Sequence, residues 1–140
     1  MGRELEESRI GYLLDTHALL WAIYEDADEK LSGKARAAIE APDHELFLSS
    51  ASIYEIAYKH RIGKLPGHEH IVFNHAALLK ELRIAELPVS MEHAFAAGRL
   101  DWERKDPFDR LIAAQAITEN LVLLTKDRAF SALPGVRVFW

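Results

Sequence analysis

Four acidic residues lie where they could act together on a phosphodiester bond. Asp15 and Asp127 each follow a short apolar run, while Glu55 and Asp109 lie near the start of segments with helical periodicity. Carboxylate oxygens are the ligands that Mg²⁺ and Mn²⁺ prefer in proteins. Because four carboxylates at one place would repel each other strongly, the pattern predicts a divalent-metal site centred on these residues.

Such a site indicates hydrolysis of a phosphodiester by water. A bound divalent cation activates water as a nucleophile, and a second cation can stabilise the leaving oxygen. The chain has no cysteine, so a thiolate zinc site and a cysteine nucleophile are excluded, and the chemistry must use oxygen or imidazole. Metal-dependent hydrolysis needs no side-chain nucleophile, and the sequence offers none.

Each acid also has a purely structural explanation. Asp15 and Asp127 could cap the helices that follow them, and Glu55 stands three residues after Ser52, the spacing of a capping box. Asp109 could be a first-turn acid that complements the helix dipole. From that dipole we expect a lowered pKa for both Glu55 and Asp109. Position leaves both explanations open, and only convergence of the acids at one place favours the functional one.

Short apolar runs alternate with segments of helical periodicity along the whole chain. The runs predict strands at residues 10–14, 46–48, 84–89, 121–124 and 136–139. The periodic segments and their caps predict helices at residues 16–24, 32–40, 52–62, 71–82, 90–98, 106–117 and 127–133. This alternation predicts a three-layer α/β/α fold with a central, mostly parallel sheet. Ligands of such sheets bind beyond the carboxyl ends of the strands, where Asp15 and Asp127 fall.

Length and composition favour a single domain over residues 1–140, with residues 1–9 as a charged leader. The chain is 49% hydrophobic, which is enough to fill one core without disulfides. Its net charge of −5 argues against a protein that coats nucleic acid without specificity. No apolar run approaches the roughly 20 residues of a membrane span. We therefore expect a cytoplasmic protein with no membrane partner.

Four segments, taken in order, together match a known pattern. They are residues 13–21 (LLDTHALLW), 49–59 (SSASIYEIAYK), 106–116 (DPFDRLIAAQA) and 124–127 (LTKD). With them the chain resembles a PIN-domain protein of the VapC toxin type, over about residues 11–140. The sequence departs from close relatives at residues 100–105 (LDWERK), where those proteins often have a Leu-Pro and a histidine pair.

The resemblance implies an Mg²⁺- or Mn²⁺-dependent endoribonuclease that is held inactive by a cognate antitoxin. The acids that match the family's catalytic metal ligands are Asp15, Glu55, Asp109 and Asp127. Asp106 matches a position beside the site, although its role as a helix cap explains it fully. We expect Thr16 and Thr125 to support the ligands through hydrogen bonds, and the protein to form a homodimer.

Basic residues flank the proposed ligands. One group follows Glu55 and comprises Lys59, Arg61 and Lys64; the other lies near the later acids and comprises Arg104, Lys105, Arg110 and Arg128. We expect Arg110, Arg128 and Lys59 to contact RNA phosphates, although solvated helix faces explain each of them equally well.

Two alternative functions remain open. The first is a catalytically silent PIN-like module, in which the acids bind an arginine of a partner, or RNA, instead of activating water. The second is a small-molecule phosphohydrolase of the aspartyl-phosphate kind. That chemistry usually needs a second aspartate two residues after the nucleophile, where this chain has His17. We expect His17 itself to turn away from the metal site.

Overall fold

A single parallel sheet organises the computed structural model, which describes residues 10–24 and 30–140. The charged leader at residues 1–9 lies outside the described residues. The strand order is β3-β2-β1-β4-β5, and all four neighbouring pairs are parallel. The strands are β1 (Gly11–Leu14), β2 (Glu45–Ser49), β3 (Ile84–Leu87), β4 (Val122–Leu124) and β5 (Arg137–Phe139). The expected parallel sheet is therefore confirmed.

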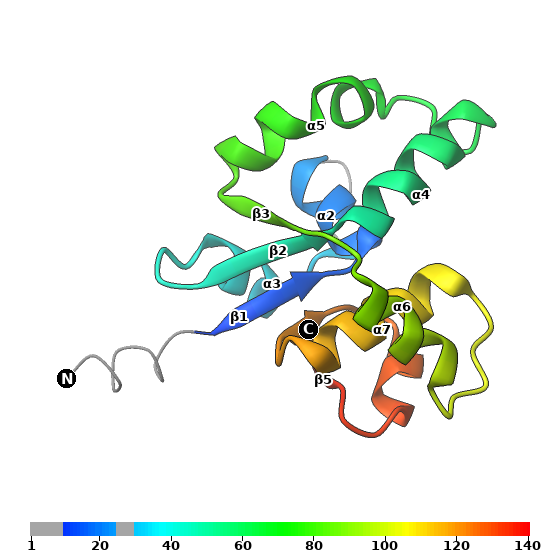
Figure 1. The fold of residues 1–140 in the computed structure, drawn as a ribbon. Coiled ribbons are helices and arrows are strands. Elements are labelled where there is room, and N and C mark those ends of the chain that lie inside the picture. Colours follow the sequence, from blue (N-terminus) through cyan, green and yellow to red (C-terminus); the bar gives the residue numbers. More distant parts are fainter. Residues whose placement is uncertain (1–9, 25–29) are drawn as a thin grey trace.

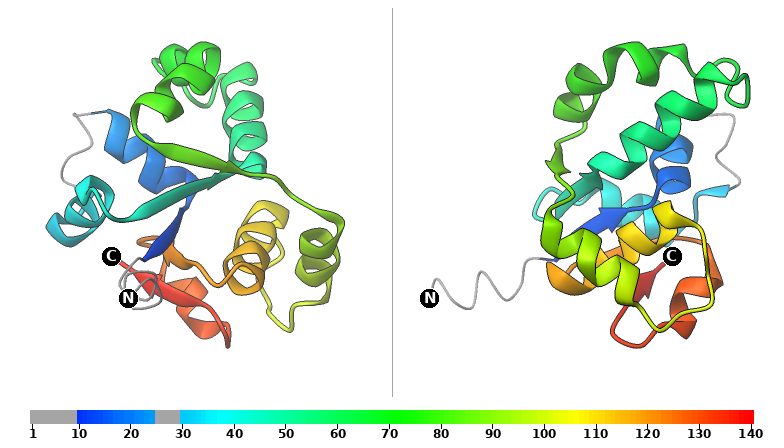
Figure 2. Two further views of the ribbon diagram at one scale, coloured as in Figure 1. Left: turned by 60° about the vertical axis from the view of Figure 1, so that its left-hand side comes forward. Right: turned by 45° about the vertical axis from the view of Figure 1, so that its right-hand side comes forward.

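Helices cover both faces of this sheet. They are α2 (Thr16–Ile23), α3 (Gly33–Glu40), α4 (Ser50–Arg61), α5 (Glu69–Glu81), α6 (Met91–Arg99), α7 (Pro107–Thr118) and the 3-10 helix η2 (Arg128–Ala132). Figure 1 shows α2, α4 and α5 on one side of the sheet and α6 and α7 on the other, and Figure 2 shows the same layers from two further directions. This is the expected α/β/α arrangement.

The core divides into two layers because successive residues of a strand point to opposite faces. Tyr12 and Leu14 pack with α2, α3 and α5 in one cluster, whereas Leu13 packs with Ile112 of α7 and Phe130 of η2 in the other. Leu13 and Leu14 have no exposed surface. Burial on both faces holds β1 in the centre of the sheet and fixes the position of Asp15 at its carboxyl end.

Most helix starts agree with their capping signals. Ser32, Ser90 and Asp106 each accept a hydrogen bond from a backbone amide at the start of the expected helix. The start of α4 was predicted wrongly. Its cap is Ser49, which accepts from the amide of Ala51 at 3.0 Å, because β2 extends through Ser49 and turns directly into the helix.

Among the described helices, none is both long and apolar enough to cross a membrane.

Candidate active site

Asp15 and Thr125 meet where two neighbouring strands end. The amide of Asp15 donates to the carbonyl of Leu124 at 3.1 Å, which continues the pairing of β1 with β4 by one residue. The hydroxyl of Thr125 donates to Asp15 Oδ2, and the amide of Asp127 donates to that hydroxyl oxygen at 3.1 Å. Thr125 therefore connects the two acids that follow these strands.

Asp15 both caps α2 and faces this connection. Its Oδ1 accepts from the amide of Ala18 at 2.7 Å, and the residue is only 9% exposed. Burial raises the pKa of Asp15, and the charge of Asp127 raises it further, against the opposing effects of Thr125, Ala18 and His17. A nearby cation would favour the ionised form of such a carboxylate.

Glu55 lies in the second turn of α4, so the expected capping-box role, with its first-turn position, is wrong. Its Oε1 accepts from the hydroxyl of Thr16 at 2.7 Å, and its Oε2 lies 2.8 Å from Lys59 Nζ. The hydroxyl of buried Ser52 lies 3.0 Å from that of Thr16. Ser52 was missed as a site residue because its spacing to Glu55 also matches a capping box.

Asp109 and Asp127 share one arginine. Arg104 Nη1 lies 2.7 Å from Asp109 Oδ2 and 3.2 Å from Asp127 Oδ2, and its Nη2 lies 3.5 Å from Asp127 Oδ1. Burial would lower the pKa of Arg104, but the bonds to Asp109 and Asp127 raise it overall. The sequence had placed Arg104 only among the flanking cations.

The pKa of Asp109 moves in the direction opposite to our expectation. Burial raises it first, and the charge of Asp106 raises it further, while Arg104 lowers it. Asp106 is exposed and caps α7, accepting from the amides of Phe108 at 2.8 Å and Asp109 at 3.3 Å. The helix start was correctly predicted, but desolvation outweighs the helix dipole at Asp109.

Taken together, these contacts place all four acids along one connected path. The path runs from Glu55 through Thr16 to the adjoining Asp15, and through Thr125 to Asp127, from which Arg104 leads to Asp109. All four acids offer oxygen ligands, which suit a hard divalent cation. In residues 10–24 and 30–140, no group of three or more acidic or histidine side chains is already gathered closely enough to hold a metal ion. The donor chemistry fits a divalent cation, and Lys59 and Arg104 now pair with three of the four acids.

Arg110 has a role that the sequence did not suggest. Its guanidinium donates to four backbone carbonyls, at 3.1 Å to Ala97, 2.7 Å to Leu100, 2.8 Å to Trp102 and 2.9 Å to Arg104. In this conformation these four hydrogen bonds hold the segment before α7. These bonds give Arg110 a structural role, and its expected contact with a phosphate stays a prediction.

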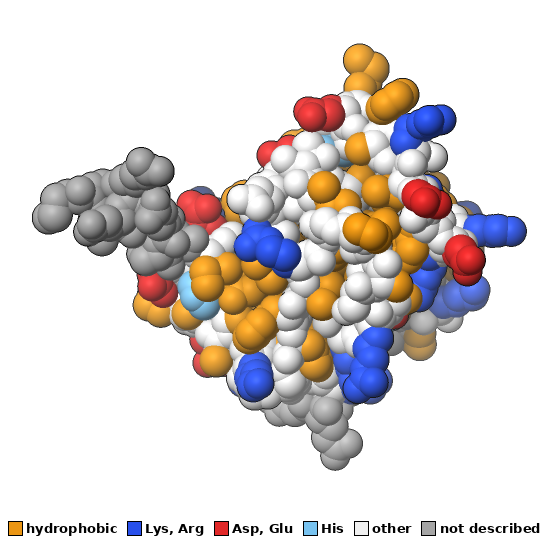
Figure 3. All heavy atoms as spheres, turned by 90° about the horizontal axis from the view of Figure 1, so that it is seen from below, with side chains coloured by type: hydrophobic (Ala, Val, Ile, Leu, Met, Phe, Trp, Pro, Cys, Tyr) orange, Lys and Arg blue, Asp and Glu red, His pale blue; other side chains and the backbone are white. Residues whose placement is uncertain are grey.

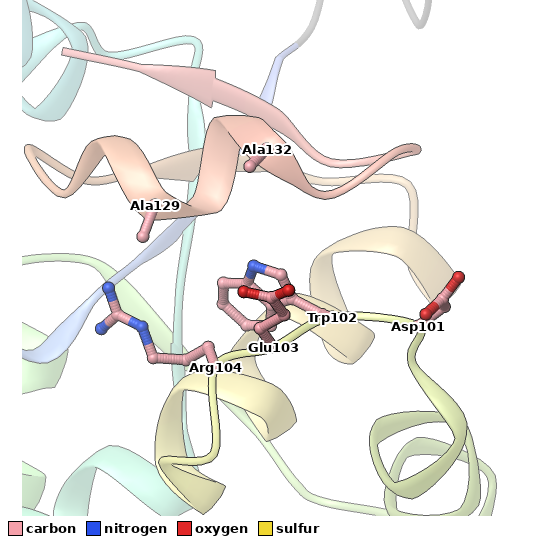
Figure 4. Close-up of a pocket in the computed structure, with 6 residues that line it drawn as sticks. All are labelled: Asp101, Trp102, Glu103, Arg104, Ala129 and Ala132. Atoms are coloured by element: carbon pink, nitrogen blue, oxygen red, sulfur yellow. The ribbon is translucent and has the colours of Figure 1, made fainter.

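Two hollows flank Asp127. One, of about 620 Å³, lies between residues 101–104 and η2 and is lined by the side chains in Figure 4, Arg104 among them. The other, of about 360 Å³, is lined in part by Thr125, Lys126, Asp127 and Arg128. Arg128 is exposed there, and its expected contact with a phosphate stays a prediction.

Two aromatic side chains of α2, those of His17 and Trp21, lie outside this path. His17 is exposed, with its ring 5.6 Å from that of Trp21, and Trp21 packs edge-on against Trp140 at 5.7 Å. The third tryptophan, Trp102, lies in the segment before α7. It is half-buried against Phe130, with ring centres 5.3 Å apart.

Solved structures share this fold. The chain is similar to one in the VapBC2 complex of Rickettsia felis bound to a promoter DNA fragment, with a TM-score of 0.69, 23% identity, and coverage of 93% of this chain and 98% of the other. It is similar to one in DNA-bound VapBC of Salmonella typhimurium, with a TM-score of 0.64, 23% identity, and coverage of 93% and 97%. A toxin–antitoxin complex from Klebsiella pneumoniae gives a TM-score of 0.60, 18% identity, and coverage of 92% and 96%.

No curated protein sequence matches the chain significantly. Residues 12–136, however, match the sequence pattern of the PIN domain, which is most of the chain. The match includes all four acids of the connected path. This chain therefore belongs to the PIN-domain family.

Proposed function

We propose that the protein is an Mg²⁺- or Mn²⁺-dependent endoribonuclease that acts as the toxin of a toxin–antitoxin pair. The observation that carries the proposal is the connected path of Asp15, Glu55, Asp109 and Asp127 at the carboxyl edge of a PIN-family sheet. Ligands of parallel sheets bind at this edge, and the path there contains only oxygen ligands.

The four acids would hold the cation, and each has a neighbour that controls its orientation. Thr125 and the amide of Ala18 fix the two oxygens of Asp15, and Thr16 fixes one oxygen of Glu55. When bound, the cation supplies activation of water and stabilisation of the leaving oxygen. Hydrogen bonds to ligand oxygens of this kind set ligand orientation and cation affinity.

A few basic side chains beside the acids would contact the RNA. Arg128 and Lys126 line the hollow beside Asp127, and Lys59 lies next to Glu55. Figure 3 shows Lys and Arg side chains in separate groups on the face seen from below, with hydrophobic side chains between them. Since the chain also carries a net charge of −5, we propose contact with a short stretch of RNA phosphates instead of broad electrostatic coating.

An antitoxin and a second copy of the chain are the proposed protein partners. The similar structure from Klebsiella pneumoniae is itself a toxin–antitoxin complex. Large apolar side chains on α4, α5 and α6 are exposed, with Tyr54 at 64%, Phe73 at 72% and Phe95 at 74%. All three are aromatic, and aromatic side chains are enriched at protein interfaces. Both complexes would form in the cytoplasm, where the RNA substrate lies.

The contact between Arg104 and two of the acids favours one alternative. A PIN-like binding module could use Asp109 and Asp127 to bind arginine instead of a cation, and these acids already pair with a guanidinium. Calorimetric titration with Mn²⁺ separates the two functions, because only the nuclease requires cation binding by these acids.

Cleavage of RNA by the purified chain tests the proposal. Total cellular RNA is incubated with the protein in Mg²⁺, Mn²⁺ or chelator, and the cut sites are mapped. We expect metal-dependent cuts that fall by more than about 100-fold in Asp109→Asn. Asp43→Asn is the matched control, because Asp43 is exposed in the turn before β2, at the opposite end of the strands. Equal cleavage by wild type and Asp109→Asn, or cleavage in chelator, would reject the proposal.

A further inference from the structure

Arg104 is the only cation in the described part of the chain that ion-pairs with two of the proposed ligands. Its guanidinium lies within 3.2 Å of an oxygen of both Asp109 and Asp127, although these residues come from different elements. Its side chain is 32% exposed, and those of Asp109 and Asp127 are 24% and 41% exposed. Both ion pairs of Arg104 are therefore accessible from solvent, and the guanidinium can separate from the two carboxylates.

The backbone that carries Arg104 is fixed. Arg110 binds the carbonyls of Leu100, Trp102 and Arg104 itself, and the ring of Trp102 packs against buried Phe130. Arg104 also lies over the ring of Trp102, at 5.9 Å from its centre. Figure 4 shows the guanidinium extended from this segment toward Ala129, which follows Asp127 by two residues in the chain. The side chain can move, but its attachment keeps it beside the acids.

We propose that Arg104 competes with the divalent cation for Asp109 and Asp127 and, once displaced, binds the RNA phosphate at the same site. The inference rests on the proposed nuclease function. A guanidinium pairs equally well with a carboxylate and with a phosphate, through the same planar set of donors. When the oxygens of Asp109 and Asp127 bind the cation, the guanidinium is free to pair with another anion, and the phosphate of a bound RNA would supply one.

Competition has a definite thermodynamic consequence. The apparent dissociation constant of the cation is raised by the reciprocal of the fraction of molecules in which Arg104 has left the carboxylates. If that fraction is about one tenth, removing the guanidinium tightens cation binding about 10-fold. The same change removes a phosphate contact and weakens RNA binding. The two effects have opposite signs, whereas damage to the fold would weaken both.

The test compares wild type with Arg104→Gln and with the control Arg99→Gln, an exposed arginine in the last turn of α6. Mn²⁺ affinity is measured by calorimetry, and RNA affinity by KM for cleavage at saturating Mn²⁺ over a series of salt concentrations. We expect Arg104→Gln to bind Mn²⁺ about 5- to 10-fold more tightly. Its KM for RNA should rise several-fold, and the salt dependence should fall by about one phosphate contact. Arg99→Gln should match wild type in both.

Each other outcome of these two measurements overturns a specific part of the proposal. Unchanged or weaker Mn²⁺ binding by Arg104→Gln overturns the competition, even if RNA cleavage remains metal-dependent. Tighter Mn²⁺ binding with an unchanged KM overturns the phosphate contact. If wild type and both variants fail to bind Mn²⁺ at all, the proposed nuclease function fails, and this inference fails with it. Arg104→Lys adds a check, because an ammonium keeps the charge but loses the planar pair of donors.

Discussion

Thr125 and Asp15 are 110 residues apart in the sequence, yet the hydroxyl of Thr125 donates a hydrogen bond to Asp15 Oδ2. Both residues are buried and follow adjacent parallel strands. The bond lowers the pKa of Asp15 against the effect of burial. Thr125 thus favours the ionised carboxylate that a cation needs.

Replacing Thr125 with valine should therefore weaken both metal binding and cleavage. The pKa of Asp15 rises further when the donor is lost, and the carboxylate is no longer fixed at Oδ2. We expect a loss of about 10- to 100-fold in cleavage rate, with the midpoint of metal binding moved to higher pH. Thr125→Ser keeps the hydroxyl and should stay close to wild type. A valine variant that binds Mn²⁺ as well as wild type at pH 6 would show that this bond has no role in the site.

Asp109→Asn should separate stability from metal binding. A cation at 100 times its dissociation constant raises the free energy of unfolding of wild type by about 2.7 kcal/mol. The variant should unfold near the wild-type temperature in chelator and gain little from Mn²⁺, because a proposed ligand is gone. Thermal unfolding with and without Mn²⁺ measures this difference. The same gain in variant and wild type would place the cation elsewhere.

The pH dependence of stability in chelator follows from the raised pKa of Asp15. The folded protein binds this proton more tightly than the unfolded chain, whose carboxyl has the ordinary pKa of 3.8. The contribution of Asp15 to stability is therefore largest at low pH and is lost as the pH rises from 3.8 through the raised value. Asp15→Asn removes this dependence and can still cap α2.

We expect the stability of Asp15→Asn relative to wild type to increase as the pH rises through that window. Urea unfolding of both proteins in chelator, from pH 4 to pH 8, gives the difference directly. A difference that stays constant or shrinks with rising pH would mean that burial does not raise the pKa of Asp15.

Arg110 should act on stability and not on RNA contact. Its four bonds to carbonyls hold residues 97–104, so Arg110→Gln should lower the free energy of unfolding by about 2–4 kcal/mol. Arg110→Lys should recover little, because one ammonium cannot match the planar fork of donors. If Arg110→Gln keeps its stability but loses salt-dependent RNA affinity, the phosphate contact first expected for Arg110 is correct.

Local signals made much of the fold predictable. Ser32, Ser90 and Asp106 each bind an amide within three residues, so the sequence around them contains the whole cap. The alternation of apolar runs and helical periods likewise predicted the parallel sheet, and the sheet placed Asp15 and Asp127 at one edge. The start of α4 failed because Ser49 and Ser52 carry the same capping chemistry.

Tertiary contacts made the rest unpredictable. The pairing of Arg104 with Asp127 spans 23 residues and depends on a segment that Arg110 holds in place. The raised pKa of Asp109 depends on burial, which its position in a helix does not reveal. The spacing from Ser52 to Glu55 was visible, but only the fold shows that both face Thr16.

A crystal soaked in Mn²⁺, with data collected at the manganese absorption edge, tests the central claim most directly. We expect an anomalous peak at the carboxyl edge of β1 and β4, about 2.1 Å from an oxygen of Asp15 and from oxygens of the other acids. The guanidinium of Arg104 should have moved off Asp109. Saturating Mn²⁺ with no peak at this edge, and with Arg104 still between Asp109 and Asp127, would contradict the account.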